Sequence, residues 1–136
     1  MPYRLDELEE LARDLGIPTR RVDADRLDVI VAEGCSLTFS NLPAQDDTLV
    51  GFDGTPWHSH GVVQFATGGG TYVECDELDI LVGLGSGELV VVSQFLDEEL
   101  SDRWLAHKQE ALDLRYMQRG EELRVLCLSS REKSGG

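Results

Sequence analysis

The sequence predicts a single α+β domain in which two helices accompany a largely antiparallel sheet of about five to six strands. Three observations lead to this fold class. The first fifteen residues carry apolar side chains at helical spacing, and several later segments alternate apolar and polar residues as strands do. The connections after residue 88 are too short for the crossovers that parallel strands need. The 136 residues are an ordinary length for one domain, which we expect to span residues 1–128.

The N-terminal segment is expected to form an amphipathic helix. Its apolar residues recur at steps of three and four, while acidic residues occupy the opposite face; the apolar positions are Leu5, Leu8, Leu11, Ala12 and Leu15. Gly16 followed by Pro18 is a typical stop, because glycine accepts a left-handed cap and proline cannot continue the hydrogen-bond ladder. The apolar face should cover a sheet or a partner.

The segments that follow alternate with the period of two that strands show. Residues 26–32 and 36–40 flank Glu33 and Gly34, which indicates a hairpin, and a third strand over residues 48–52 leads to the turn Asp53-Gly54. Residues 88–96 are apolar on both faces near their start, so we expect a central strand there with residues 89–92 buried. Further strands are expected over residues 99–106 and 121–128.

A second helix is expected near residues 74–84. Its apolar residues recur at helical spacing, its acidic opening turn suits the positive end of the helix dipole, and three glycines should end it, at positions 83, 85 and 87. The run Gly68-Gly69-Gly70 is either a hinge or a loop. Residues 107–119 fit a strand or a helix equally well, and residues 129–136 are expected to form a disordered tail.

Composition limits the classes of partner. Asp and Glu number 26 against 12 Lys and Arg, which gives a formal charge of −14. Such a field repels nucleic acid and anionic lipid and speeds encounter with a basic protein. No apolar run approaches the roughly 18 residues that span a bilayer, and the three cysteines lack disulfide or zinc-knuckle spacing. We therefore expect a cytoplasmic protein of bacterial type that binds neither nucleic acid nor membrane.

The segment Trp57-His58-Ser59-His60 holds the densest potential chemistry in the chain. If it is extended, His58 and His60 fall on the same face and offer two imidazoles to one metal ion. We therefore expect no cofactor, with a zinc ion at this pair as the alternative. A third ligand would have to come from elsewhere in the fold, with four candidates in the sequence: His107, Asp53, Asp76 and Glu33.

The histidine segment resembles short motifs of two metal-binding families. In JAMM-type isopeptidases an aromatic residue precedes His-Ser/Thr-His-Pro, and a later Ser-x-x-Asp supplies the third zinc ligand. Trp57-His58-Ser59-His60 resembles that opening, while Gly61, Gly69 and Tyr72 stand where the proline, serine and aspartate would fall. Cupins carry a glutamate four residues after the second histidine of His-x-His, and Gln64 takes that place here. Each resemblance implies a metal-dependent site at His58 and His60.

Two functions of different class follow from these features. The first is a small acidic protein-binding module, such as an inhibitor or immunity-type partner of a basic effector. The chain resembles immunity proteins in size, charge and α+β style. The expected contact surface joins an aromatic anchor to clustered charge and comprises Asp53, Trp57, His58, His60, Glu74, Asp76, Glu77 and Asp79. The alternative is a metal-dependent hydrolase centred on His58 and His60, and the sequence leaves open whether the protein is an enzyme. The partner, the substrate and the oligomeric state stay undetermined at this stage.

Overall fold

The computed structural model describes residues 2–111 and 121–128. The elements in chain order are α1 (Leu5–Leu15), β1 (Thr19–Asp23), β2 (Arg26–Ala32), β3 (Cys35–Leu42), the 3-10 turn η1 (Pro43–Gln45), β4 (Asp47–Phe52), β5 (His58–Ser59), β6 (Val63–Gly68), β7 (Thr71–Cys75), α2 (Glu77–Ser86), β8 (Leu89–Leu96), β9 (Glu99–His107), α3 (Lys108–Ala111) and β10 (Glu121–Leu126). Within the ambiguous segment 107–119, Lys108–Ala111 is helical. Residues 112–119 and the tail 129–136 lie outside the described residues.

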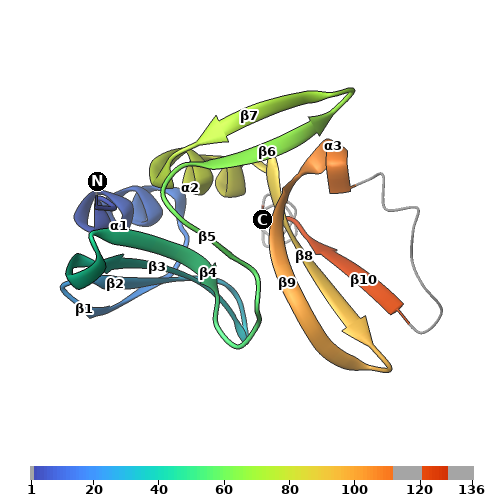
Figure 1. Cartoon of the computed structure of the whole chain (residues 1–136), viewed down its shortest axis with the longest axis horizontal. Coiled ribbons are helices and arrows are strands. Elements are labelled where there is room, and N and C mark those ends of the chain that lie inside the picture. Colours follow the sequence, from blue (N-terminus) through green and yellow to red (C-terminus); the bar gives the residue numbers. More distant parts are fainter. Residues whose placement is uncertain (1, 112–120, 129–136) are drawn as a thin grey trace.

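The strands form three sheets, and every pairing among the described residues is antiparallel. Five strands follow the order β1-β2-β3-β4-β5, three follow β10-β8-β9, and β6 pairs with β7. Figure 1 shows α1 and α2 over the five-stranded sheet, the three-stranded sheet beside it, and the β6–β7 hairpin above α2. The predicted α+β class is confirmed, with the strands divided among three sheets.

The five-stranded sheet has one apolar and one polar face, because side chains alternate along each strand. Leu27, Phe39 and Val50 face one another across β2, β3 and β4 and are fully buried. The same core contains Leu8 and Ala12, so the apolar face of α1 covers the sheet as predicted. The opposite face carries a polar row across all five strands: Arg20, Asp28, Thr38, Gly51 and His58.

The second helix begins later than the sequence pattern predicts. Residues Thr71–Cys75 pair with β6, and α2 starts at Glu77 behind a capping box formed by Asp76 and Asp79. Two of the glycines expected to end the helix lie inside it, and only Gly87 adopts the left-handed conformation that ends it. A Cβ on Gly83 would lie 2.7 Å from Leu89 Cγ, so glycine at this helical position lets β8 pack closely against α2.

The strand expected at the centre of a sheet is confirmed as β8, which lies between β10 and β9. Its four apolar residues expose at most 4% of their surface, at positions Leu89, Val90, Val91 and Val92. Val91 faces Leu105 on β9, and Val92 faces Val125 on β10. Leu89 and Val91 belong to the large core, whereas Val90 and Val92 belong to a second apolar cluster with Ala106 and Ala111, so both faces of β8 are covered, as a continuous apolar run predicts.

Candidate functional site

The histidine segment is held against the edge of the five-stranded sheet by a short pairing. Gly51 faces His58 and Val50 faces Ser59 across β4 and β5. A Cβ on Gly51 would lie 2.9 Å from the Trp57 carbonyl oxygen, so only glycine lets β5 approach this closely. The Trp57 N–H donates to Asp102 Oδ1 at 3.0 Å, which ties the segment to β9 in the neighbouring sheet.

Both imidazoles have a fixed tautomer when neutral. His58 Nδ1 lies 3.0 Å from the Pro56 carbonyl oxygen, and His60 Nδ1 lies 2.5 Å from the Thr48 carbonyl oxygen and 3.2 Å from Asp47 Oδ2. A carbonyl oxygen only accepts hydrogen bonds, so each Nδ1 carries the proton and each Nε2 presents its lone pair. The two ring centroids are 5.3 Å apart with an interplanar angle of 88°. The rings therefore lie together, as alternation along an extended segment predicts.

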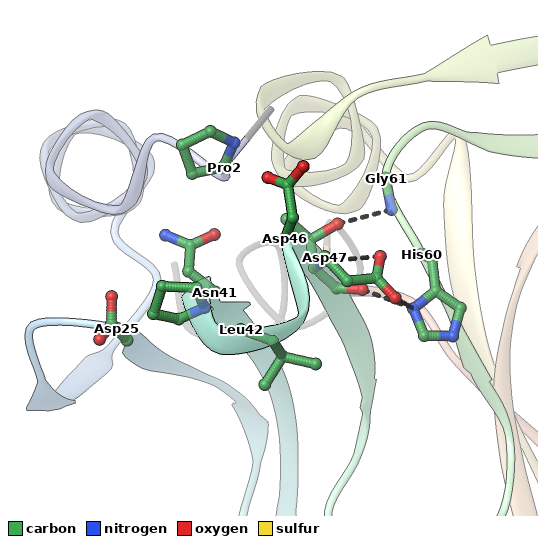
Figure 2. A pocket seen from close by; sticks show the side chains of 10 residues that line it. Pro2, Asp25, Asn41, Leu42, Asp46, Asp47, His60 and Gly61 are labelled. Carbon is green, nitrogen blue, oxygen red and sulfur yellow. Dashed lines mark hydrogen bonds and ion pairs between the residues drawn. The ribbon is translucent and has the colours of Figure 1, made fainter.

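A pocket of about 550 Å³ opens beside His60 (Figure 2). It is lined by three aspartates and mostly small or apolar neighbours: Asp25, Asp46 and Asp47 with Pro2, Asn41, Leu42, Pro43, Thr48, His60 and Gly61. Its volume falls within the roughly 300–1,000 Å³ of ligand-binding pockets. The walls are tied together, because the Gly61 N–H donates to Thr48 Oγ1 at 2.8 Å and the Asn41 side chain bonds both backbone groups of Tyr3.

The pocket carboxylates lack the arginine partners that several carboxylates elsewhere in the fold possess, such as Asp28 and Glu77. Among the described residues, Asp25 and Asp46 form no ion pair, and the Asp47 carboxylate contacts only His60 and its neighbour's backbone N–H. Six described cationic side chains instead form ion pairs with other carboxylates: Arg4, Arg20, Arg21, Arg26, Lys108 and Arg124. The pocket is therefore a place where negative charge is exposed and unneutralised by the rest of the described chain.

The acidic turn expected to join the contact surface has mainly structural contacts. Glu77 is only 6% exposed, because it accepts hydrogen bonds from the Arg4 backbone N–H at 2.9 Å and from Arg4 Nη2 at 3.1 Å. Asp76 caps α2, and the Asp79 backbone N–H together with the Arg4 charge lowers its pKa below the ordinary value. Glu74 and Asp79 are exposed. The turn thus offers fewer free carboxylates than its sequence suggests.

Six of the eight expected contact residues line three neighbouring pockets. His60 lines the aspartate pocket, while Asp53, Trp57 and His58 line a smaller hollow of about 310 Å³ on the polar face of the five-stranded sheet. Asp76 and Glu77 line a groove of about 370 Å³ with Tyr3, Arg4 and Val62, and this groove shares Pro2 and Gly61 with the aspartate pocket. Pro2 and Gly61 therefore connect the aspartate pocket with the groove that Asp76 and Glu77 line.

The sequence analysis does not identify the polar residues that line the pocket beside His60, among them Asp25, Asn41, Asp46 and Asp47. The adjacent aspartates 46 and 47 were a visible signal, since they follow Pro43 in a polar connection between two strands. Their closeness to His60 depends on the β4–β5 pairing, which spans only two residue pairs and leaves no sequence pattern.

Two of the four candidate third metal ligands are engaged elsewhere. His107 Nε2 lies 3.2 Å from Glu88 Oε2 at the end of β9, and Asp76 is held by Arg4. Over residues 2–111 and 121–128, no group of three or more His, Cys, Asp or Glu side chains is placed to hold a metal ion. The described chain therefore supplies two imidazoles and no third protein ligand.

Searches against protein-family models, curated proteins and solved structures found no match for this chain. Among the helices that the structure describes, none is long and apolar enough to cross a membrane. The proposals that follow therefore rest on the geometry and charge of the described residues.

Proposed function

We propose that this protein binds a basic protein, as an inhibitor or immunity-type partner of a basic effector would. The observation that carries the proposal is the aspartate pocket, which is lined by Asp25, Asp46 and Asp47 and, among the residues that the structure describes, by no lysine or arginine. In Figure 2 these three residues surround the pocket together with Asn41 and His60. A lysine or arginine side chain of the partner is the natural occupant.

The energetics favour a cation in this pocket. Carboxylates that already pair with arginine would have to exchange one partner for another, whereas Asp25 and Asp46 form no ion pair with the described residues. Hydrogen bonds between an ammonium or guanidinium group and a carboxylate are about twice as strong as neutral ones. Pro2, Leu42 and Pro43 line the same pocket and would cover the aliphatic stem of the partner's side chain.

The charge of the whole chain supports the same function. A formal charge of −14 creates a field that steers a basic partner toward the surface and raises the association rate. The rim would extend over exposed residues of the predicted contact surface, including Asp53, His58 and Glu74, and over Val62, which is 56% exposed. Trp57 would support this rim from beneath, since its ring packs 6.0 Å from that of Phe52.

The test compares two aspartates that share a backbone conformation. Asp46 has φ of 50° and lines the pocket, while Asp97 has φ of 51° and lies in the β8–β9 turn. Both are exposed, and asparagine tolerates the left-handed region, so Asp46→Asn and Asp97→Asn should both fold. A basic protein encoded beside this chain is the first partner to examine, by stopped-flow measurement of its association rate at several salt concentrations.

We expect Asp46→Asn, alone and with Asp25→Asn, to slow association and to reduce its salt dependence, because the field is screened over a Debye length of about 8 Å. Asp97→Asn should leave both unchanged. If Asp46→Asn and Asp97→Asn changed the association rate equally, or if neither changed a tight binding affinity, the pocket would not be the contact site. Charge reversal at Asp76 or Glu77 is a poorer test, because it would also disturb the α2 cap and the Arg4 pair.

A further inference from the structure

The two imidazoles of His58 and His60 are oriented as metal-binding imidazoles usually are. Histidine ligands typically donate the N–H of one ring nitrogen to a carbonyl or carboxylate, which leaves the other nitrogen free to bind the metal. His58 does this through the Pro56 carbonyl, and His60 through the Thr48 carbonyl and the Asp47 carboxylate. Neither Nε2 has a partner among the described residues, so both lone pairs are available.

The spacing of the rings permits a shared ion when both Nε2 atoms point toward it. An ion about 2.0–2.1 Å from each Nε2, with a roughly tetrahedral angle between the two bonds, places the ring centres about 5.2 Å apart. The observed separation of the centroids is 5.3 Å. Both rings are open to solvent, and the His60 side chain is 46% exposed, so an ion could reach them without unfolding of the chain.

We propose that His58 and His60 bind one divalent transition-metal ion, such as Zn²⁺ or Co²⁺, through their Nε2 atoms. The described residues offer no third ligand, so the remaining positions would be held by water and would be open to a ligand from another molecule. Two nitrogen ligands favour zinc or cobalt over magnesium or calcium, which prefer oxygen. Asp47 would act as a positioning residue, because it contacts Nδ1 of His60 and not the ion. This site does not depend on the proposed basic partner.

The chain contains its own control in His107. Both of its ring nitrogens are engaged, Nε2 with Glu88 and Nδ1 with the backbone N–H of Gln109. Isothermal titration with Zn²⁺ should show one site per chain in the unmodified protein, and His58→Gln or His60→Gln should each weaken binding by about tenfold or more. His107→Gln should bind zinc as the unmodified protein does. Asp47→Asn should weaken binding by about tenfold, at the lower end of what loss of an outer-shell partner costs.

A spectroscopic measurement keeps the test independent of mutant folding. In the unmodified protein, Zn²⁺ should shift the ring proton resonances of His58 and His60 together at a common affinity, while those of His107 stay in place. The proposal is overturned if the two rings respond at different affinities, if His107→Gln weakens binding as much as the other variants, or if no stoichiometric site is found. Binding that survives both His58→Gln and His60→Gln would assign the zinc to surface carboxylates and would also overturn it.

Discussion

Replacing Asp28 with asparagine should destabilise the protein by about 1–3 kcal/mol, because hydrogen bonds to a charged group contribute about 1.5–3 kcal/mol and exposed ion pairs about 0–1 kcal/mol. Asp28 lies in the polar row between Arg20 and Thr38, and its side chain is 5% exposed. It accepts hydrogen bonds from Thr38 Oγ1 at 2.9 Å, Arg20 Nη2 at 3.0 Å and Arg26 Nε at 3.3 Å. The Arg20 side chain is 70% exposed, which limits what its ion pair contributes.

The pH dependence of this loss distinguishes a charge effect from a packing effect. Burial alone would raise the pKa of Asp28, but the hydrogen bonds from Thr38 and Arg20 and the charge of Arg26 outweigh it and lower the pKa. A carboxyl group whose pKa is lower in the folded state stabilises fully above its unfolded pKa of about 3.9, and that contribution is lost as the pH falls through the folded value. The gap between the two proteins should therefore be widest near neutral pH and should close in acid.

Urea unfolding at a series of pH values measures this gap directly. Asp53→Asn is the matched control, because Asp53 is exposed and has no ion pair within the described residues, so its loss should change stability by no more than about 0.5 kcal/mol. The reasoning is refuted if Asp28→Asn is as stable as the unmodified protein at neutral pH, or if the gap stays constant into acid.

Three further changes test the fold. Val91 is 1% exposed, so Val91→Ala should lower the free energy of unfolding in urea by about 1–3 kcal/mol. Val125 is 50% exposed, so its control substitution Val125→Ala should lower it by about 0.5 kcal/mol or less. Equal losses would show that the burial of β8 is misassigned. Asp76→Ala should lower stability by about 0.5–2 kcal/mol in thermal unfolding through loss of the α2 cap, and an unchanged melting temperature would argue against the capping box. Gly51→Ala should displace β5 and alter Trp57 fluorescence, since the new Cβ meets the Trp57 carbonyl; an unaltered emission spectrum would count against that contact.

Elements with a strong apolar pattern were predictable from the sequence. The helix α1 has the predicted bounds because its leucines keep one face and Gly16 adopts the left-handed cap. The strand β8 has the predicted central place because four consecutive apolar residues can be buried only when both faces of a strand are covered. In both elements the local pattern and the tertiary packing favour the same structure.

Elements whose placement depends on partners far along the chain were mispredicted or missed. The edge strand β1 is polar and partly exposed, so its sequence carries no alternation. The strand β7 exposes four of its five residues and is defined by its pairing with β6, so its last residues resembled the start of a helix. The sequence predicts a helix end at Gly83 and Gly85, whereas in the fold both lie inside α2, where the lack of a Cβ lets Leu89 and Leu15 pack against them.

The candidate site divides in the same way. The proximity of His58 and His60 followed from alternation along an extended segment, which is a local property. The aspartate pocket could not be predicted, because Asp25, Asp46 and His60 come from three separate connections that the sheet brings together. The burial of Glu77 was equally hidden, since it depends on Arg4, a residue 73 positions away.

The most direct test of the central claim is an NMR titration with acetyl-arginine amide, a single guanidinium side chain without a protein around it. We expect saturable shifts of the backbone amides of Asp25, Asn41, Asp46 and Asp47, which should weaken with salt and be lost in the Asp25→Asn/Asp46→Asn double variant. Acetyl-glutamine amide, which is uncharged, should cause none of these shifts. Equal shifts with the two compounds would contradict the claim that this pocket receives a cationic side chain. The claim would also be contradicted if acetyl-arginine amide shifted the amides of exposed carboxylates such as Asp97 as strongly as those of the pocket.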